Sequence, residues 1–502
     1  MTRLARVICV VLAAFALLAS AACSGEEDTF RILAGSEVKD LEPLLKESGL
    51  NVELTYTGTL DGAEQVASGG ADGRYDAIWF SSNRYLSLID GARERLSTQT
   101  KVMVSPVVLG LKPAKAKELG WDTAPPSWSD IAAAATQGRF TFGMTNPASS
   151  NSGFSALVGV AAALSDADEA LSAEQIDAVT PKLKGFFSAQ RLTSGSSGWL
   201  ADAYARSPGV DGLINYESVL RGMNLTLIYP SDGVVSADYP LTLLTASPNK
   251  AAYDELAAWL RTPDTQRKIM TTTFRRPIVP GIGTAQPVLE LPFPNRRSAA
   301  DELIAAYLNE VRVPARARFV LDTSGSMEGD RIAALRQALV TLTGADTSAS
   351  GTFSRFRNRE AVTMIPFNDA PLPPRAFTLP ERDPEAALAE IRSFAESLQA
   401  GGGTAIFDAL RTAYQEPVEP GHYTSIVLMT DGENTDGSGA GDFDAFFRGL
   451  PEEQRRVPTF VVLFGDSDVD EMTRIAELTG GAVFDARTGS LAAAFKEIRG
   501  YQ

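Results

Sequence analysis

Short apolar runs alternate with amphipathic stretches along most of this chain. In the first half the apolar runs include Phe30 to Leu33, Val52 to Tyr56 and Ala77 to Phe80, and stretches such as Val38 to Lys46 lie between them. Runs of this length predict buried strands, and strands that alternate with helices are typical of α/β folds. We therefore expect an α/β structure over residues 29–284.

The alternation returns in the last third of the chain. Ala317 to Leu321 and Ser425 to Met429 predict buried strands, and Ala405 to Tyr414 predicts a helix. Between the two regions, Pro287 to Arg297 is rich in proline, and its apolar residues follow neither helix nor strand periodicity, which indicates an extended linker. A helix is expected from about Ser298 to Val311, and its apolar positions at helical spacing predict that it packs on a neighbouring domain.

The length of 502 residues is too great for one hydrophobic core. The patterns divide the chain into an export signal at 1–22, a tether at 23–28, a first domain at 29–284, a linker with a connecting helix at 285–313, and a last domain at 314–502.

The first residues predict export. Arg3 and Arg6 precede an apolar run from Val7 to Leu18, which is shorter than the ~20 residues of a membrane-spanning helix. The stretch from Leu18 to Cys23 resembles a bacterial lipoprotein box, although Ser20 stands where the box usually has Leu. The resemblance implies that Cys23 is lipidated and anchors the protein to the extracytoplasmic face of the cell membrane. Ordinary secretion with cleavage near Cys23 is the alternative.

Composition excludes several classes of function. The formal net charge is −16, and loss of Arg3 and Arg6 with the signal makes it −18, so nucleic acid is not an expected partner. The only cysteines are Cys9 and Cys23, and the only histidine is His422, in a turn expected at the surface. These counts rule out a disulfide framework, a cysteine zinc site and most hydrolytic constellations.

Polar loops follow successive strands of the first region, beginning with Gly35-Ser36 and Thr57-Gly58-Thr59. The segment Thr145 to Gly153 likewise leads from a strand at Phe140 to Met144 into a helix at Phe154 to Leu164. Ligands of open α/β sheets bind where such loops converge, and a helix start favours an anion or a carbonyl oxygen. For the segment before the helix, simple capping by Ser149, Asn151 or Ser152 is the alternative.

This order of strands and loops resembles the type II extracellular solute-binding proteins of bacterial transport systems. The resemblance covers about Thr29 to Thr284 and includes Asp76 to Ser82, Pro147 to Gly153 and Asn215 to Glu217. It implies a two-lobed periplasmic-binding-protein-like (type II) α/β fold that closes on a ligand, with a cleft lined by Ser36, Thr59, Ser82, Ser152 and Tyr216. An oxyanion, a small neutral solute and an empty structural cleft all stay open, and Arg84 is either a ligand cation or a solvated surface residue.

Three loops of the last region carry oxygen ligands. Asp322-Thr323-Ser324-Gly325-Ser326 follows one strand, Asp431 follows another, and Thr404 comes after three glycines at the start of a helix. Carboxylate and hydroxyl oxygens of this kind suit a hard cation such as Mg²⁺, and strand-end loops of an α/β sheet meet at one edge. Taken alone, the first loop is also explained as a capping turn before the helix at Arg331.

These loops resemble the metal-ion-dependent adhesion site of the von Willebrand factor A (VWA) domain. The resemblance implies a doubly wound, Rossmann-like fold in which Ser324, Ser326 and Thr404 bind Mg²⁺ (or Mn²⁺ or Ca²⁺) directly, while Asp322 and Asp431 bind it directly or through water. The remaining strands of that fold are expected at Val362 to Phe367, Thr459 to Phe464 and Ala482 to Phe484, and its helices near Asp330 to Leu342, Pro384 to Leu398, Asp470 to Leu478 and Leu491 to Ile498.

Together these features predict a lipid-anchored extracytoplasmic binding protein. Its metal ion is expected to bind an Asp or Glu carboxylate of a protein partner, and its first domain binds a small solute or none. The alternative is the substrate-binding receptor of an ABC-type transport system, in which the VWA domain docks or regulates. The insertion Asn434 to Asp442 either shapes partner choice or is a solvated loop. No enzyme activity is expected, because the three metal loops carry no lysine or histidine for phosphoryl transfer.

Overall fold

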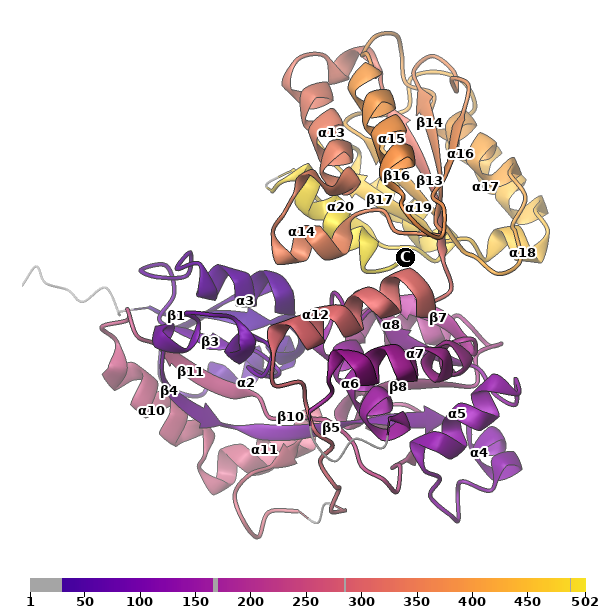
Figure 1. Ribbon diagram of the computed structural model, residues 1–502. Coiled ribbons are helices and arrows are strands. Elements are labelled where there is room, and N and C mark those ends of the chain that lie inside the picture. Colours follow the sequence, from indigo (N-terminus) through magenta and orange to yellow (C-terminus); the bar gives the residue numbers. More distant parts are fainter. Residues whose placement is uncertain (1–28, 166–169, 284–285, 488) are drawn as a thin grey trace, which may run out of the picture.

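The structure is a computed structural model that describes residues 29–165, 170–283, 286–487 and 489–502. The described residues form three β-sheets with helices packed on them, two in the first domain and one in the last (Figure 1). The export signal, Cys23 and the tether that the sequence predicts lie outside the described residues. Within the described ranges, no helix combines the length and apolar character needed to cross a bilayer.

The first lobe is built on a sheet with the strand order β2-β1-β3-β11-β4. Its parallel strands are β1 (Phe30–Gly35), β2 (Val52–Thr57) and β3 (Ala77–Trp79), and β11 (Pro240–Leu244) runs antiparallel to β3 and to β4 (Leu96–Lys101). The helices of this lobe are η1 (Ser36–Leu41), α2 (Glu42–Leu45), α3 (Thr59–Ala67), η2 (Leu86–Leu88), η3 (Arg93–Arg95), α10 (Lys250–Leu260) and α11 (Pro263–Thr273). The loops after β1, β2 and β3 therefore meet at one edge, as predicted.

The second lobe has the strand order β10-β5-β8-β6-β7, with β9 and β12 also paired to β5. Its strands are β5 (Met103–Leu111), β6 (Phe142–Thr145), β7 (Gln190–Ser194), β8 (Gly212–Tyr216), β9 (Thr226–Ile228), β10 (Ser236–Ala237) and β12 (Arg276–Pro277). Its helices are α4 (Pro113–Leu119), α5 (Trp128–Thr136), α6 (Asn151–Leu164), α7 (Ala173–Phe187), α8 (Ser197–Ala205) and α9 (Glu217–Arg221). The chain crosses between the lobes after β4, after β10 and again after α11, where β12 returns to the second lobe, so each lobe is a separate unit joined by short connections.

The connecting helix forms where the sequence predicts it, as α12 (Arg297–Ala306) continued by η4 (Tyr307–Val311). Ala299, Leu303 and Tyr307 are buried against α6 and α7 of the second lobe. The Tyr307 hydroxyl donates a hydrogen bond to Gln190 Oε1 at 3.1 Å. The connector is thus part of the second lobe's surface rather than a free tether.

The last domain has the strand order β15-β14-β13-β16-β17-β18. Its parallel strands are β13 (Ala315–Asp322), β14 (Ala361–Phe367), β16 (Tyr423–Thr430), β17 (Thr459–Leu463) and β18 (Val483–Asp485). The edge strand β15 (Arg375–Thr378) is antiparallel to β14 and was not predicted, so the sheet is mixed. Within β13, Phe319 packs into the core on one face and Val320 into the core on the other, as a doubly wound sheet requires.

Helices cover both faces of this sheet (Figure 1). One face is covered by α13 (Asp330–Val340), α15 (Glu385–Ser397) and α20 (Leu491–Arg499), and the other by α16 (Ile406–Gln415), α17 (Ala440–Gly449) and α19 (Val469–Thr479). The shorter elements are η5 (Gly325–Met327), η6 (Thr341–Ala345), α14 (Ala349–Ser354) and α18 (Glu452–Arg455). Since α17 begins at Ala440, the end of the insertion Asn434 to Asp442 is helix rather than loop.

Candidate metal site and solute cleft

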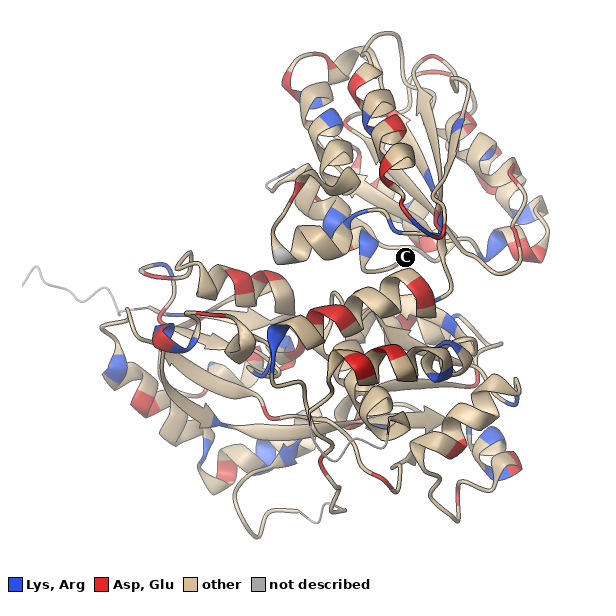
Figure 2. Ribbon diagram, viewed as in Figure 1, with Lys and Arg blue, Asp and Glu red and all other residues tan. Residues whose placement is uncertain are grey.

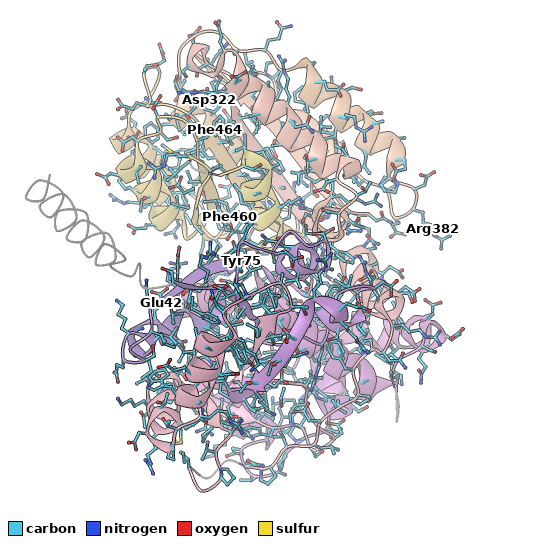
Figure 3. All side chains as sticks on the ribbon, turned by 90° about the vertical axis from the view of Figure 1, so that its left-hand side faces the viewer. Glu42, Tyr75, Asp322, Arg382, Phe460 and Phe464 are labelled. Atoms are coloured by element: carbon cyan, nitrogen blue, oxygen red, sulfur yellow. The ribbon has the colours of Figure 1, made fainter. Side chains whose placement is uncertain are left out.

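The first predicted metal loop is fixed by hydrogen bonds at the end of β13. Asp322 is fully buried and accepts the Ser324 amide on Oδ1 at 2.8 Å and the Thr430 hydroxyl on Oδ2 at 2.6 Å. The hydroxyls of Ser324 and Ser326 lie 2.9 Å apart. Figure 3 places Asp322 at the end of the last domain that faces away from the two lobes.

The loop after β16 meets this first loop directly. Asp431 is buried, and its Oδ1 accepts the Ser326 hydroxyl at 2.7 Å. Its Oδ2 accepts Arg331 Nη1 at 2.6 Å, and Arg331 Nη2 donates to Asp466 Oδ2 at 2.8 Å. Sequence reasoning treated Arg331 only as a helix start and missed its contact with Asp431. A basic residue in the first turn after D-x-S-x-S was the available signal.

The glycine loop before Thr404 lies against the same site. The Gly401 amide donates to Thr323 O and the Gly325 amide donates to Gly402 O, both at 2.9 Å. Gly402 has φ +87°, a conformation that a residue with a side chain adopts only with strain. The structure thus joins Asp322, Ser324, Ser326 and Asp431 through side-chain hydrogen bonds, and it brings in Thr404 through the main chain of its loop.

The insertion after Asp431 contacts the third loop. The Thr404 amide donates to Thr435 Oγ1 at 3.0 Å and to Asp436 Oδ2 at 3.2 Å. Asp442 instead accepts the Gly439 amide at 3.1 Å at the start of α17. Of the two interpretations of the insertion, these contacts favour a role at the rim of the site over a freely solvated loop.

The chemistry of these five residues fits a hard cation. All the metal-binding atoms of their side chains would be oxygens, and the hydroxyl of Thr404, a residue that is 5% exposed, has no hydrogen-bond partner among the described residues. Burial raises the pKa of Asp322, hydrogen bonds from Ser324 and Thr430 offset part of that rise, and in the described chain this carboxylate has no ion-pair partner. Buried carboxylates are usually paired or bound to a metal. No cluster of three or more His, Cys, Asp or Glu suited to a metal occurs in the described ranges, so the ligands here would be mainly hydroxyls.

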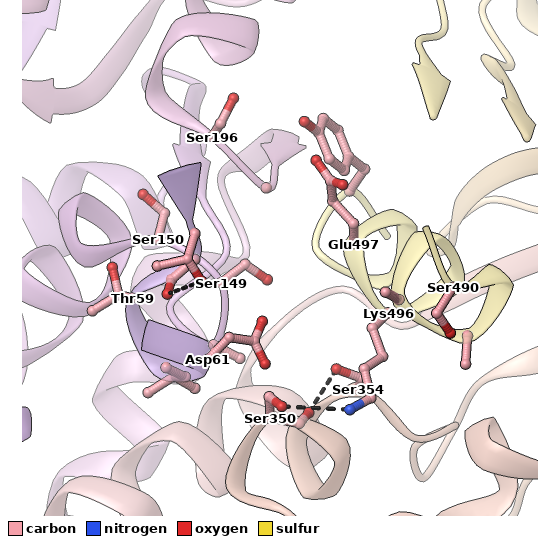
Figure 4. Close-up of a pocket in the computed structure, with 18 of the residues that line it drawn as sticks. Thr59, Asp61, Ser149, Ser150, Ser196, Ser350, Ser354, Ser490, Lys496 and Glu497 are labelled. Carbon is pink, nitrogen blue, oxygen red and sulfur yellow. Dashed lines mark hydrogen bonds between the residues drawn. The ribbon is translucent and has the colours of Figure 1, made fainter. Parts of the chain in front are cut away.

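A cavity of about 720 Å³ lies where both lobes and the last domain meet (Figure 4). Of the predicted cleft residues, Ser36 and Thr59 line it from the first lobe. The second lobe contributes the loops at Ser149-Ser150 and Gly195-Ser196, and the last domain contributes residues of α13, α14 and α20. The VWA domain therefore forms a third side of the predicted cleft, which was not expected from the sequence.

The other predicted cleft residues do not line this cavity. Ser152 is fully buried, and its hydroxyl lies within 2.8–3.1 Å of the hydroxyls of Thr145, Ser150 and Ser197. The cap of α6 is Ser150, which makes no side-chain capping bond, so the capping alternative does not hold in its simple form. Ser82 is also buried, and its hydroxyl accepts the Arg84 amide at 3.2 Å.

Tyr216 lies deeper between the lobes, beside polar groups that the sequence did not single out. Its hydroxyl accepts Asn151 Nδ2 at 3.0 Å, and burial, followed by Glu37 and Tyr239, raises its pKa. Arg275 Nη1 donates to Asp40 at 2.7 Å, and its guanidinium lies 4.9 Å from the centre of the Tyr239 ring. The Tyr239 hydroxyl, Arg275 Nε and Ser81 Oγ are buried between the lobes without a well-formed hydrogen bond in the described chain, although Arg275 lies beside Tyr239 and Ser81 beside Tyr216.

Arg84 and His422 lie in surroundings that differ from those predicted from the sequence. Arg84 is neither at the cavity nor freely solvated, because it pairs with Glu290 at 3.4 Å and lies over the Phe293 ring of the linker. His422 is half-buried between the second lobe and the last domain, where it lines a smaller cavity with Gln190 and Arg191, rather than being a surface residue.

The fold and these sites define the class of protein. A two-lobed α/β unit with a ligand-sized cleft is joined to a doubly wound α/β unit with oxygen ligands at its strand ends. Residues 45–275 match the family model of bacterial extracellular solute-binding proteins, and residues 318–497 match that of the von Willebrand factor type A domain. The chain therefore carries an extracellular solute-binding domain followed by a VWA domain, as the sequence predicted.

Curated relatives match over a short stretch of about 130 residues. The chain is 32% identical over 133 residues to the inter-alpha-trypsin inhibitor heavy chain H4 of Sus scrofa, a match that covers 25% of this chain and 13% of that protein. It is 31% identical over 128 residues to an uncharacterised protein of Synechocystis sp., which covers 25% of this chain and 27% of that protein. The chain thus spans well under half the length of these relatives.

Solved structures of periplasmic binding proteins are similar to part of the chain. The periplasmic binding protein AfuA of Actinobacillus pleuropneumoniae, bound to fructose-6-phosphate, is 13% identical, with a TM-score of 0.44 and coverage of 57% of this chain and 99% of AfuA. Apo ferric ion-binding protein A of Pasteurella haemolytica is 12% identical, with a TM-score of 0.44 and coverage of 56% and 96%. The domain assignment itself rests on the two family models.

Both matched families consist mostly of binding or adhesion domains without enzyme activity, and the solute-binding family indicates an extracytoplasmic location. VWA domains commonly bind a divalent metal. Figure 2 shows that Lys and Arg positions are interspersed with Asp and Glu positions along the helices of both domains.

Proposed function

We propose that this protein is a membrane-anchored extracytoplasmic binding lipoprotein whose VWA domain recognises a protein partner through a divalent cation. Asp322, Ser324, Ser326, Thr404 and Asp431 would hold the ion, with Mg²⁺ as the expected species and Mn²⁺ or Ca²⁺ as substitutes. Such an ion supplies a positive charge and a coordination position for an Asp or Glu carboxylate of the partner. The chain's own side chains orient the loops, and Cys23 would carry the lipid anchor.

The observation that carries this proposal is the convergence of three sequence-distant loops on one buried, unpaired carboxylate. The Ser326 hydroxyl bonds Asp431, and the Asp322 carboxylate accepts Thr430 from the neighbouring strand. Two main-chain hydrogen bonds bring the glycine loop to the same point. A simple capping turn needs neither the second loop nor the third.

Partner capture in the presence and absence of free metal tests the proposal. Proteins recovered on the immobilised chain in Mg²⁺ are expected to be released by a chelator, to be absent with Asp322→Ala, and to be displaced by short Asp- or Glu-containing peptides. Asp485→Ala is the matched control, because Asp485 is an exposed aspartate at the carboxyl end of β18 in the same sheet. Partners that survive chelation and Asp322→Ala alike would contradict the proposal.

The alternative function is the substrate-binding receptor of an ABC-type transport system, and the unpartnered polar atoms between the lobes favour a true ligand site. The carboxylates of Glu37, Asp61 and Glu497 face the cavity without an ion-pair partner among the described residues, which disfavours an oxyanion. Ligand binding raises thermal stability by mass action. A thermal-shift screen of the full chain is therefore expected to give shifts with neutral or amine-bearing solutes and none with sulfate or phosphate. A shift with sulfate or phosphate would contradict this solute class.

A further inference from the structure

The VWA domain is seated on the second lobe at the edge of the solute cleft. The Tyr501 ring packs edge-on against Trp199 of α8, with ring centres 4.8 Å apart. Asn146 Nδ2, in the loop before α6, donates to Arg499 O at 3.4 Å. A Cβ on Gly500 would lie 2.6 Å from Ser149 Oγ, so the end of α20 lies directly on the loop that opens α6.

The same domain also rests on the first lobe. Its helix α14 packs against α3, the helix that begins at Thr59 on the opposite side of the cleft. The cavity of about 720 Å³ lies between these two contacts, and Figure 4 shows Asp61 and Ser149 on the lobe side facing Glu497 and Ser350 on the VWA side. The VWA domain therefore bridges both lobes across the mouth of the cleft. The lobes cannot hinge apart unless one of the two contacts breaks.

Helix α13 connects this contact region to the candidate metal site. Its first turn carries Arg331, which is bonded to Asp431. Gln337 near its other end, and Thr341 and Ala345 in its continuation η6, line the cavity at the cleft mouth. From Arg331 to Thr341 the helix spans roughly 15 Å at 1.5 Å per residue. A displacement of the cavity end would thus move the guanidinium that neutralises Asp431.

We propose that the VWA domain closes the mouth of the solute cleft when α14 and α20 contact the two lobes, an arrangement called the seated state. We further propose that α13 couples the seated state to the state of the metal site. This inference rests on the proposed metal-binding function. In the seated state, which the structure shows, Arg331 holds Asp431 and the site binds a cation weakly. Opening of the lobes unseats α20, releases α13, which packs on α20, and frees Asp431. Seating and cation binding then oppose each other, and by linkage each weakens the other by the same factor.

A disulfide that locks the seated state tests the coupling. Ser149→Cys with Gly500→Cys, in residues 23–502 carrying Cys23→Ser, leaves no other thiol and keeps every described residue. A Cβ built on Gly500 lies 3.0 Å from Ser149 Cβ, which is shorter than the usual ~3.5–4.5 Å of a disulfide, so the two segments must separate by about half an ångström when the bond forms. The disulfide is expected to form, and the oxidised protein is expected to bind Mn²⁺ at least about fivefold more weakly than the reduced protein in calorimetry. In return, Mn²⁺ should slow formation of the disulfide.

Trp199→Ala tests the same coupling from the other side. Removing this ring loosens the seat without touching the metal loops, so tighter Mn²⁺ binding is expected. Trp121→Ala is the control, because Trp121 packs on Phe140 in the second lobe and makes no ring contact with the VWA domain among the described residues.

Equal, measurable Mn²⁺ affinities in the oxidised, reduced and Trp199→Ala proteins would overturn the coupling and leave the proposed function standing. Failure of the disulfide to form would overturn the seating, and absence of Mn²⁺ binding in every form would overturn the proposed function and the coupling together.

Discussion

At the scale of single residues, the candidate metal site depends on how charge is balanced around two buried carboxylates. Among the described residues, the charge of Asp322 is balanced only by hydrogen bonds from Ser324 and Thr430, whereas Asp431 has an ion pair with Arg331. The five metal-site residues could be proposed from the sequence because they stand in a recognisable spacing at strand ends. Arg331 could not, since its role depends on where the guanidinium points and not on its position in a motif.

Arg331→Gln is expected to tighten binding of Mg²⁺ or Mn²⁺. The substitution removes a positive charge from Asp431, and after discounting for solvent screening of the partly exposed guanidinium the gain is about 1 kcal/mol, or roughly fivefold in Kd. Isothermal titration calorimetry measures it. Arg336→Gln is the control on the same helix, because Arg336 donates to Leu398 O and does not contact Asp431. Weaker metal binding by Arg331→Gln would show that Arg331 orders the site rather than competing with the ion.

At the scale of elements, the sequence predicted most strands and helices because each buried strand is a short apolar run. The strands β1, β2, β13, β14 and β16 and the helices α6, α16 and α20 all overlap their predicted ranges. The edge strand β15 was missed because Arg375–Thr378 alternates without a continuous apolar run, and only pairing with β14 makes it a strand. The α17 helix was missed because glycines and aspartates before it indicate a loop, although Phe443 and Phe447 are buried at helical spacing.

Gly402→Ala is expected to weaken metal binding. Gly402 adopts φ +87°, and a Cβ there would lie 2.9 Å from Asp369 Oδ1, so the loop that presents Thr404 must shift. The conformational strain costs about 1–2 kcal/mol. Gly421→Ala is the matched control, because Gly421 has φ +85° with open space around it and precedes β16, at the end of the strand opposite Asp431. Calorimetry should show reduced affinity for Gly402→Ala alone, and a similar loss in both variants would contradict a specific role for the loop.

At the scale of the whole molecule, the two domains could be predicted from sequence but their contact could not. Domain order follows from runs of strands and a proline-rich linker, whereas the packing of Tyr501 on Trp199 joins residues about 300 positions apart with no pattern in common. The connector is also tied to the VWA domain by buried charges. Glu360 accepts hydrogen bonds from Arg312 and Arg499, and all three side chains are at least 95% buried.

Glu360→Gln is expected to destabilise the protein by about 3–5 kcal/mol at pH 7, since it leaves two buried arginines without their counter-charge. Burial raises the pKa of Glu360, but Arg499 and Arg312 outweigh it and hold the pKa below its ordinary value of 4.5. A carboxyl with a lowered folded-state pKa stabilises above its unfolded pKa, and that contribution is lost as the pH falls through the folded value. Urea unfolding should therefore show a difference between Glu360→Gln and wild type that shrinks below about pH 4. Glu396→Gln, an exposed position on α15, should show little difference at either pH.

Calorimetric titration of Mg²⁺ or Mn²⁺ into the full chain tests the central claim most directly. One ion is expected to bind per chain in the wild type, and none in Asp322→Ala, while Asp485→Ala should bind as the wild type does. If the wild-type chain takes up neither ion, or if Asp322→Ala binds with unchanged affinity, the three loops at the strand ends of the VWA domain do not form a metal site.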